Sequence, residues 1–107
     1  MRILLDQGAP KPIIRYLPSH VVQTAFEMGW STLFNGELLN QAEVSGFELL
    51  ITTDQNLEYQ QNLSARRISI VVLSTTRWPV IEAKIARIVQ VVQRSKTGSY
   101  KVVKFDD

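Results

Sequence analysis

The sequence predicts an α/β domain in which a mostly parallel central sheet of four to five strands lies between two layers of helices. Short β-branched and leucine-rich runs, clearest at 49–52 and 68–73, lack the alternation of a half-exposed strand and are typical of strands buried on both faces. Such runs alternate along the chain with segments of helical character, which favours parallel strands joined by right-handed crossovers. The length of 107 residues fits a single domain spanning 1–107.

Composition narrows the class of protein. Hydrophobic residues make up 45% of the chain and charged residues 21%, as in an ordinary globular protein with a core. The absence of cysteine excludes a disulfide framework and a thiolate metal site. The first apolar run is too short for a signal peptide and no stretch reaches membrane-spanning length, so we expect a cytoplasmic protein without membrane association. A net charge of +2 permits a polyanionic partner but is small for a dedicated nucleic-acid binder.

The first quarter of the chain predicts a strand, a short helix and a second strand. The apolar run at 2–5 is the first strand. A helix is expected at about 12–16, because Pro12 suits a first helical turn and Pro18 prevents continuation. The β-branched segment at 20–24 is the second strand.

The next segment predicts a turn and a longer helix. Residues 25–28 form a helical turn that Gly29 closes in the left-handed conformation. After an apolar connector of undefined shape, Asn35 is expected to be the N-cap of a helix that runs to about Ser45 and ends at Gly46.

Two further strands flank a polar segment. The third strand is expected at 49–53, and the strongest strand pattern, at 68–73, is expected at the centre of the sheet. Residues 56–63 are glutamine-rich and fit either a short helix or a structured loop.

The last part of the chain predicts one long helix and an edge strand. Pro79 opens a helix that persists to about Arg94, with a stripe of isoleucine and valine at i, i+4, i+7 and i+11 from residue 81. Residues 100–105 alternate and contain two lysines, which guard an edge strand against pairing with other chains.

Carboxylates follow two of the predicted strands directly. Asp6 ends the first strand and Asp54 follows the third, so both belong at the carboxyl edge of a parallel sheet, where ligands of such sheets bind. Glu37, at a helix start, could approach the same edge. Like charges oppose one another's ionisation, and a hard cation such as Mg²⁺ relieves that conflict. A bound metal would activate water for phosphodiester hydrolysis.

Each of these acids also has a purely structural interpretation. A single strand-terminal aspartate commonly caps a turn, and an acid in a first helical turn complements the helix dipole. Two aspartates together at the carboxyl edge of the sheet favour a functional site over the structural interpretation. Gln7 and Asn56 could orient metal-bound water or a phosphate oxygen.

Basic residues could guide a nucleic acid to this edge. Arg66, Arg67 and Lys11 are the candidates, although Arg66 and Arg67 also fit a solvated pair ahead of a strand.

The order and spacing of four motifs resemble the PIN-like superfamily, and more closely the short bacterial PIN-like proteins related to the toxin ribonucleases of toxin–antitoxin pairs. The motifs are Ile3-Leu4-Leu5-Asp6-Gln7, Gly29-Trp30-Ser31, Asn35-Gly36-Glu37-Leu38-Leu39 and Thr52-Thr53-Asp54-Gln55-Asn56-Leu57. The resemblance covers the chain from Arg2 to about Pro79. It implies an α/β/α fold and an acidic cluster that binds Mg²⁺ or Mn²⁺ and cleaves single-stranded RNA, in a protein that an antitoxin could partner.

Carried over by position, the resemblance implies that Asp6, Glu37 and Asp54 hold the metal and are catalytic. The chain departs from the family pattern at two places, with Asn56 where a second acid of the Thr-x-Asp motif is usual and Gln7 after the first acid. The site is therefore less charged than the family norm.

Three functions follow from the sequence. The first is a metal-dependent endoribonuclease-like PIN domain, possible toxin of a toxin–antitoxin pair. The alternative is a non-catalytic or weakly active interaction module, such as a homodimer or a partner-bound remnant. The third is a receiver-like or phosphatase-like domain with Asp6 or Asp54 as nucleophile. This third hypothesis requires a phosphate-binding lysine at another strand end, for which Lys96 and Lys101 are poor candidates.

Overall fold

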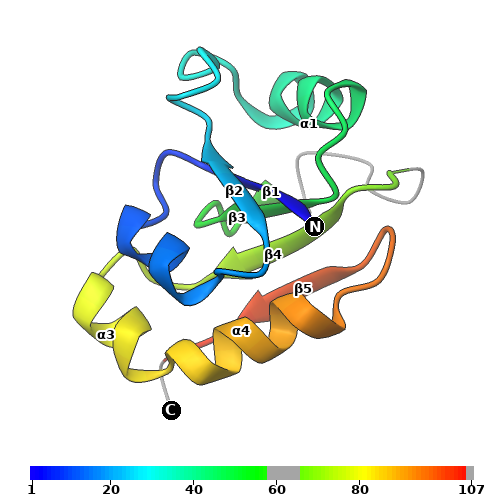
Figure 1. Ribbon diagram of the computed structural model, residues 1–107. Helices are drawn as coiled ribbons and strands as arrows, with labels where there is room; N and C mark the ends of the chain where they lie inside the picture. Colours follow the sequence, from blue (N-terminus) through cyan, green and yellow to red (C-terminus); the bar gives the residue numbers. More distant parts are fainter. Residues whose placement is uncertain (58–65, 106–107) are drawn as a thin grey trace.

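The computed structural model, which describes residues 1–57 and 66–105, contains a five-stranded sheet in the order β2-β1-β3-β4-β5 (Figure 1). Every pairing in it is parallel. The strands are β1 (Arg2–Leu5), β2 (Val21–Thr24), β3 (Leu49–Thr52), β4 (Ser69–Leu73) and β5 (Tyr100–Val103). This architecture confirms the predicted α/β class.

The interior strands are the apolar runs of the sequence. All residues of β3 and β4 are buried, as expected for strands covered on both faces. The middle position belongs to β3, with β4 one place nearer the edge, so the expectation that the 68–73 strand is central is only approximately right. The register aligns Leu50 of β3 with Leu4 of β1 and with Ile70 of β4.

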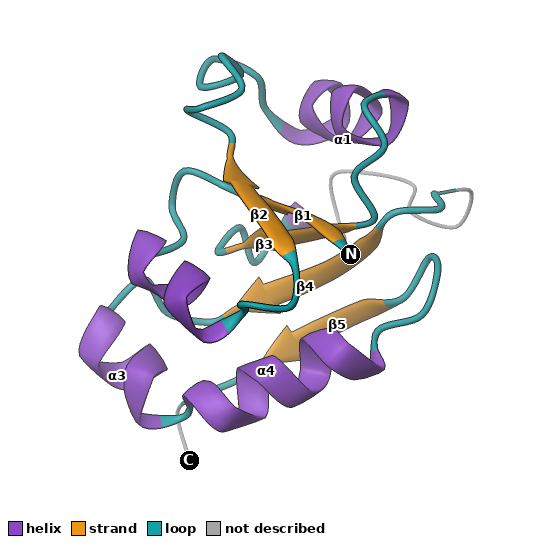
Figure 2. Cartoon of the chain, in the orientation of Figure 1, coloured by secondary structure: helices purple, strands orange, loops and turns teal. Residues whose placement is uncertain are grey.

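Helices cover both faces of the sheet, which gives three layers (Figure 2). The helical elements are the 3₁₀ helix η1 (Lys11–Tyr16) and the α-helices α1 (Asn35–Val44), α3 (Trp78–Ala83) and α4 (Ile85–Arg94). Two hydrophobic clusters fill the space between the layers. One joins Ile13, Ile81 and Ile88 to one face of the sheet. The other joins Leu38 and Leu39 of α1 to the opposite face.

The single helix expected at 79–94 is wrong, because the chain forms two helices separated at Lys84. The backbone of Lys84 adopts φ −121° and ψ 25°, outside the α region, and its N–H bonds to Ile81 O at 3.0 Å. No glycine or proline marks the break. The apolar stripe nevertheless faces the core across it, with Ile81, Ile88 and Val92 fully buried.

One smaller prediction also needs correction, and another is confirmed. Asn35 is the first residue of α1 rather than its N-cap, and the extended Phe34 holds the N-cap position. Residues 25–28 form the expected helical turn, in which Met28 N donates to Thr24 O at 3.2 Å, and Gly29 ends it with the expected positive φ of 77°. This turn is closed by an exchange in which Glu27 N donates to Thr24 Oγ1 at 3.0 Å and Thr24 N donates to Glu27 Oε1 at 3.3 Å.

Most of the glutamine-rich segment at 56–63, for which the sequence leaves helix and loop open, lies outside the described residues.

Candidate functional site

The two strand-end aspartates come together at the carboxyl edge of the sheet. β1 and β3 are hydrogen-bonded neighbours in parallel register, with Leu5 opposite Ile51. The register continues one step further, since Asp6 N donates to Ile51 O at 2.9 Å. The residues that follow the two strands therefore meet, as the sequence predicts for Asp6 and Asp54.

Thr52, which the sequence analysis did not single out, connects the two aspartates. Its side chain is 1% exposed. The hydroxyl donates to Asp6 Oδ2 at 2.7 Å and accepts a hydrogen bond from Asp54 N at 3.1 Å. One sequence signal would have identified this threonine: it ends the apolar run at 49–52, two residues before Asp54.

Both aspartates also shape the turns that follow them. Asp6 Oδ1 accepts a hydrogen bond from Gln7 N at 2.8 Å, and Asp54 Oδ1 accepts one from Asn56 N at 3.0 Å. The second contact is an Asx-type turn. The two aspartates therefore stabilise the turns that follow them, as the structural interpretation predicts, and they also lie close to one another.

A small cavity of about 50 Å³ opens between these aspartates and α1. Carboxylates and a hydroxyl occupy one side of it and apolar side chains the other. Its lining residues are Asp6, Leu33, Phe34, Leu38, Leu39, Leu50, Thr52, Asp54 and Leu57. The cavity has room for an ion or one to two water molecules, each with a share of about 30 Å³ in the liquid, and no room for a nucleotide.

Glu37 does not line this cavity. It is exposed in the first turn of α1, where its backbone N–H donates to Phe34 O at 3.1 Å. Across residues 1–57 and 66–105, no group of three or more His, Asp or Glu side chains is close enough to hold a metal ion. The structure therefore pairs Asp6 with Asp54 and leaves the third predicted acid apart.

The auxiliary polar residues lie near the acids. Gln7 and Asn56 are exposed and belong to the turns that follow Asp6 and Asp54. Each contributes a backbone N–H to its neighbouring carboxylate. Lys11 is exposed at the start of η1, which follows the Asp6 turn.

The arginines lie at the other edge of the sheet. Arg66 and Arg67 precede β4, whose carboxyl end points toward the aspartates, so the length of the strand separates them from the acids. Arg66 Nη1 donates to Asn40 Oδ1 of α1. Lys96, one of the two lysines considered for a phosphatase-like site, also lies at this amino edge.

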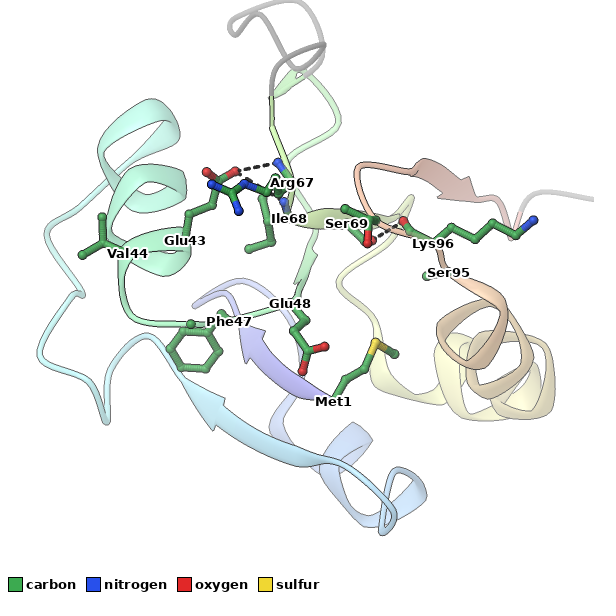
Figure 3. Close-up of a pocket in the computed structure, with 12 residues that line it drawn as sticks. Met1, Glu43, Val44, Phe47, Glu48, Arg67, Ile68, Ser69, Ser95 and Lys96 are labelled. Atoms are coloured by element: carbon green, nitrogen blue, oxygen red, sulfur yellow. Dashed lines mark hydrogen bonds between the residues drawn. The ribbon is translucent and has the colours of Figure 1, made fainter.

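A larger cavity of about 780 Å³ occupies the amino edge of the sheet (Figure 3). Its walls carry charges of both signs. Glu43 Oε1 accepts hydrogen bonds from Arg67 N at 3.2 Å and Ile68 N at 3.4 Å, and the Lys96 ammonium points away from the cavity. This cavity was not predicted from the sequence, because it forms where the ends of α1 and α4 meet the starts of β1, β3 and β4.

His20 lies beside the start of β1. Its Nδ1 is 3.1 Å from the amino nitrogen of Met1, and its buried Nε2 has no hydrogen-bond partner in the described part of the chain. Burial lowers the pKa of His20 below its ordinary value. The Met1 ammonium lowers this pKa further, and Glu48 partly opposes both effects.

No family model, curated protein or solved structure matches this chain. Among the described residues, no helix has the length and apolar character needed to cross a bilayer. The PIN-like resemblance therefore rests on the motifs of the sequence alone.

Proposed function

We propose that this chain is a PIN-like domain that hydrolyses single-stranded RNA with a divalent cation, Mg²⁺ or Mn²⁺, held by Asp6 and Asp54. One observation carries the proposal: two carboxylates from adjacent parallel strands line one cavity at the edge of the sheet where ligands of α/β folds bind.

The chemistry of these residues fits such a cation. Mg²⁺ is commonly held by one or two carboxylates and retains several waters, so a pair of aspartates is a sufficient set of protein ligands. Each carboxylate accepts up to about four hydrogen bonds or metal contacts. The bonds from Thr52 and the turn N–H groups therefore orient the oxygens without exhausting them.

Each residue at this edge has a separate role in the proposal. Asp6 and Asp54 hold the cation, and the Thr52 hydroxyl fixes the orientation of Asp6. Glu37, exposed in the first turn of α1 and outside the cavity, holds no cation in this proposal. Gln7 and Asn56 orient water or a phosphate oxygen. A divalent cation bound there supplies Lewis-acid activation of water and of the phosphodiester. Lys11 adds positive charge beside this edge.

The test compares purified wild-type protein with an Asp6→Asn/Asp54→Asn variant on a single-stranded RNA in the presence of Mn²⁺. We expect cleavage by the wild type and loss of cleavage in the variant, which preserves side-chain size. A Glu37→Gln variant measures the part of the third acid separately. Equal cleavage by the wild type and the double variant would assign the activity to a contaminant.

A non-catalytic module that binds an antitoxin or a second copy of the chain is the second candidate. It is favoured by the absence of a three-acid group in the described chain and by the engagement of both Asp6 oxygens in hydrogen bonds. Binding of a cation to the folded state raises the melting temperature by mass action. A rise of several degrees in millimolar Mn²⁺, absent in the double variant, would count against this candidate.

A further inference from the structure

Phe34 occupies an unusual place for a phenyl ring. It is the N-cap of α1, a position that favours residues able to hydrogen-bond the first helical N–H groups, and it makes no side-chain capping bond. It also contributes little to the core, since its side chain is 67% exposed. At the same time it lines the small cavity that holds Asp6 and Asp54.

The size of that cavity decides where a nucleotide would lie. About 50 Å³ admits a cation with little more than its water, whereas a nucleobase is several times larger. If a phosphodiester approaches the two carboxylates, the sugar and base on either side of it must remain outside. An exposed aromatic ring in the wall of the same cavity then provides an apolar face beside the phosphate.

We propose that Phe34 is a stacking platform for one unpaired base of the RNA bound at the Asp6–Asp54 cavity. This inference rests on the proposed function and specifies its substrate: a strand with an accessible base face next to the phosphate. Stacking on an aromatic ring is tolerant of base identity, because every base has a π face. A base inside a duplex is already stacked and cannot take this position, so the site selects single strands without reading sequence.

The chain supplies a matched control in Phe26. It is the other strongly exposed phenylalanine of the described residues, 72% exposed, and it does not line the cavity. Both rings belong to the connection between β2 and α1. Replacing either one by leucine removes the π face and retains an apolar side chain of similar size.

The experiment measures the affinity of a short fluorescein-labelled single-stranded RNA by anisotropy in the otherwise wild-type chain, with Ca²⁺ in place of Mg²⁺ or Mn²⁺ so that the carboxylates of Asp6 and Asp54 remain available to a cation. The RNA is recovered afterwards to verify that it is uncut. We expect Phe34→Leu to weaken binding by roughly 5- to 100-fold. Phe34→Trp should preserve or strengthen binding, and Phe26→Leu should change it less than twofold. The ratio of affinities for single-stranded and duplex RNA should be smaller in Phe34→Leu than in the protein that retains Phe34.

Two results would overturn the inference: RNA affinity equal in Phe34→Leu and its parent, or no RNA binding by the parent. Weakening by Phe26→Leu equal to that by Phe34→Leu would instead indicate a general apolar surface on this connection and would also overturn it. Cleavage by the otherwise wild-type chain is measured separately. Phe34-dependent binding without cleavage would support stacking and reject the nuclease, whereas cleavage insensitive to Phe34 would do the reverse.

Discussion

At the level of single residues, the buried hydroxyl of Thr52 organises the carboxyl edge. Two hydrogen bonds satisfy it, one given to a carboxylate and one received from a backbone N–H. A hydroxyl buried without partners would cost about 1–3 kcal/mol, so this position favours threonine because the Asp6 carboxylate accepts its hydrogen bond and the backbone N–H of Asp54 donates one. The Asp6 side chain and the threonine are therefore interdependent.

We expect Thr52→Val to lower the free energy of unfolding by about 1–3 kcal/mol, because valine has nearly the same shape and makes neither hydrogen bond. Urea denaturation measures the loss. Thr97→Val is the control, since Thr97 is exposed and exposed substitutions usually stay within about 0.5 kcal/mol. A Thr52→Val protein as stable as the wild type would show that the hydroxyl does not hold the edge together.

His20 provides a pH-dependent prediction. The pKa of His20 is lowered in the folded state, so as the pH falls below about 6.5 the unfolded chain takes up the proton first. The stabilisation by neutral His20 is thus complete above the unfolded pKa and is lost as the pH falls through the folded pKa. We expect the wild type to lose more stability than His20→Gln between about pH 7.5 and 5.5. The difference between the two proteins, measured by urea denaturation at each pH, cancels the carboxylates they share, and a constant difference would contradict the assignment.

At the level of elements, α1 ends in a Schellman motif. Gly46 N donates to Glu43 O at 3.1 Å and Phe47 N donates to Ala42 O at 3.0 Å, with Gly46 at φ 86°. The motif turns the chain directly into β3. It therefore determines where Leu49 enters the sheet and, five residues later, where Asp54 joins the carboxyl edge.

We expect Gly46→Ala to be more destabilising than Gly29→Ala. Both glycines have positive φ, and an alanine there costs about 1–2 kcal/mol. At Gly29 an added Cβ meets nothing within 4 Å, whereas at Gly46 it lies 3.1 Å from Arg2 Nη1. That guanidinium donates to Ser45 O and lies over the Phe47 ring, 4.4 Å from its centroid. Equal losses in thermal or urea denaturation would mean that Arg2 moves aside at no cost.

The break between α3 and α4 shows where sequence patterns stop being informative. The apolar stripe correctly predicted the buried face, because burial depends on the spacing of side chains. It could not show the interruption at Lys84, since the residues around it are ordinary helix formers. Both helices bury residues in the same hydrophobic cluster as Ile13 of η1 and one face of the sheet, and no residue type near Lys84 indicates that the helix is interrupted there.

At the level of the whole molecule, the placement of Asp6 and Asp54 at one end of the sheet was predictable from the sequence. Parallel pairing alone brings the carboxyl ends of β1 and β3 together. The same logic had no means to place Glu37. A helix start can lie at many distances from the carboxyl ends of the strands, and that distance depends on the path of the apolar connector at 30–34, whose shape no sequence pattern predicted. The position of the arginines at the opposite edge follows from strand direction and was in principle predictable.

The outer strands of the sheet are β2 and β5. An edge strand with free backbone groups can pair with a second chain, and an exposed lysine on it opposes such pairing. Lys101 is exposed in β5, whose described partner is β4 alone. We expect Lys101→Val to leave the free energy of unfolding within about 0.5 kcal/mol of the wild type.

The same substitution should nevertheless produce oligomers that light scattering detects on concentration, because valine strengthens strand pairing and removes the charge. Lys11→Val is the matched control, since it removes the same charge and exposes the same side chain on η1, away from either edge. If only Lys101→Val associates, the open edge of β5 is the route and its lysine keeps copies of the chain apart. If both variants associate equally, the loss of net charge is sufficient and edge pairing is not the cause.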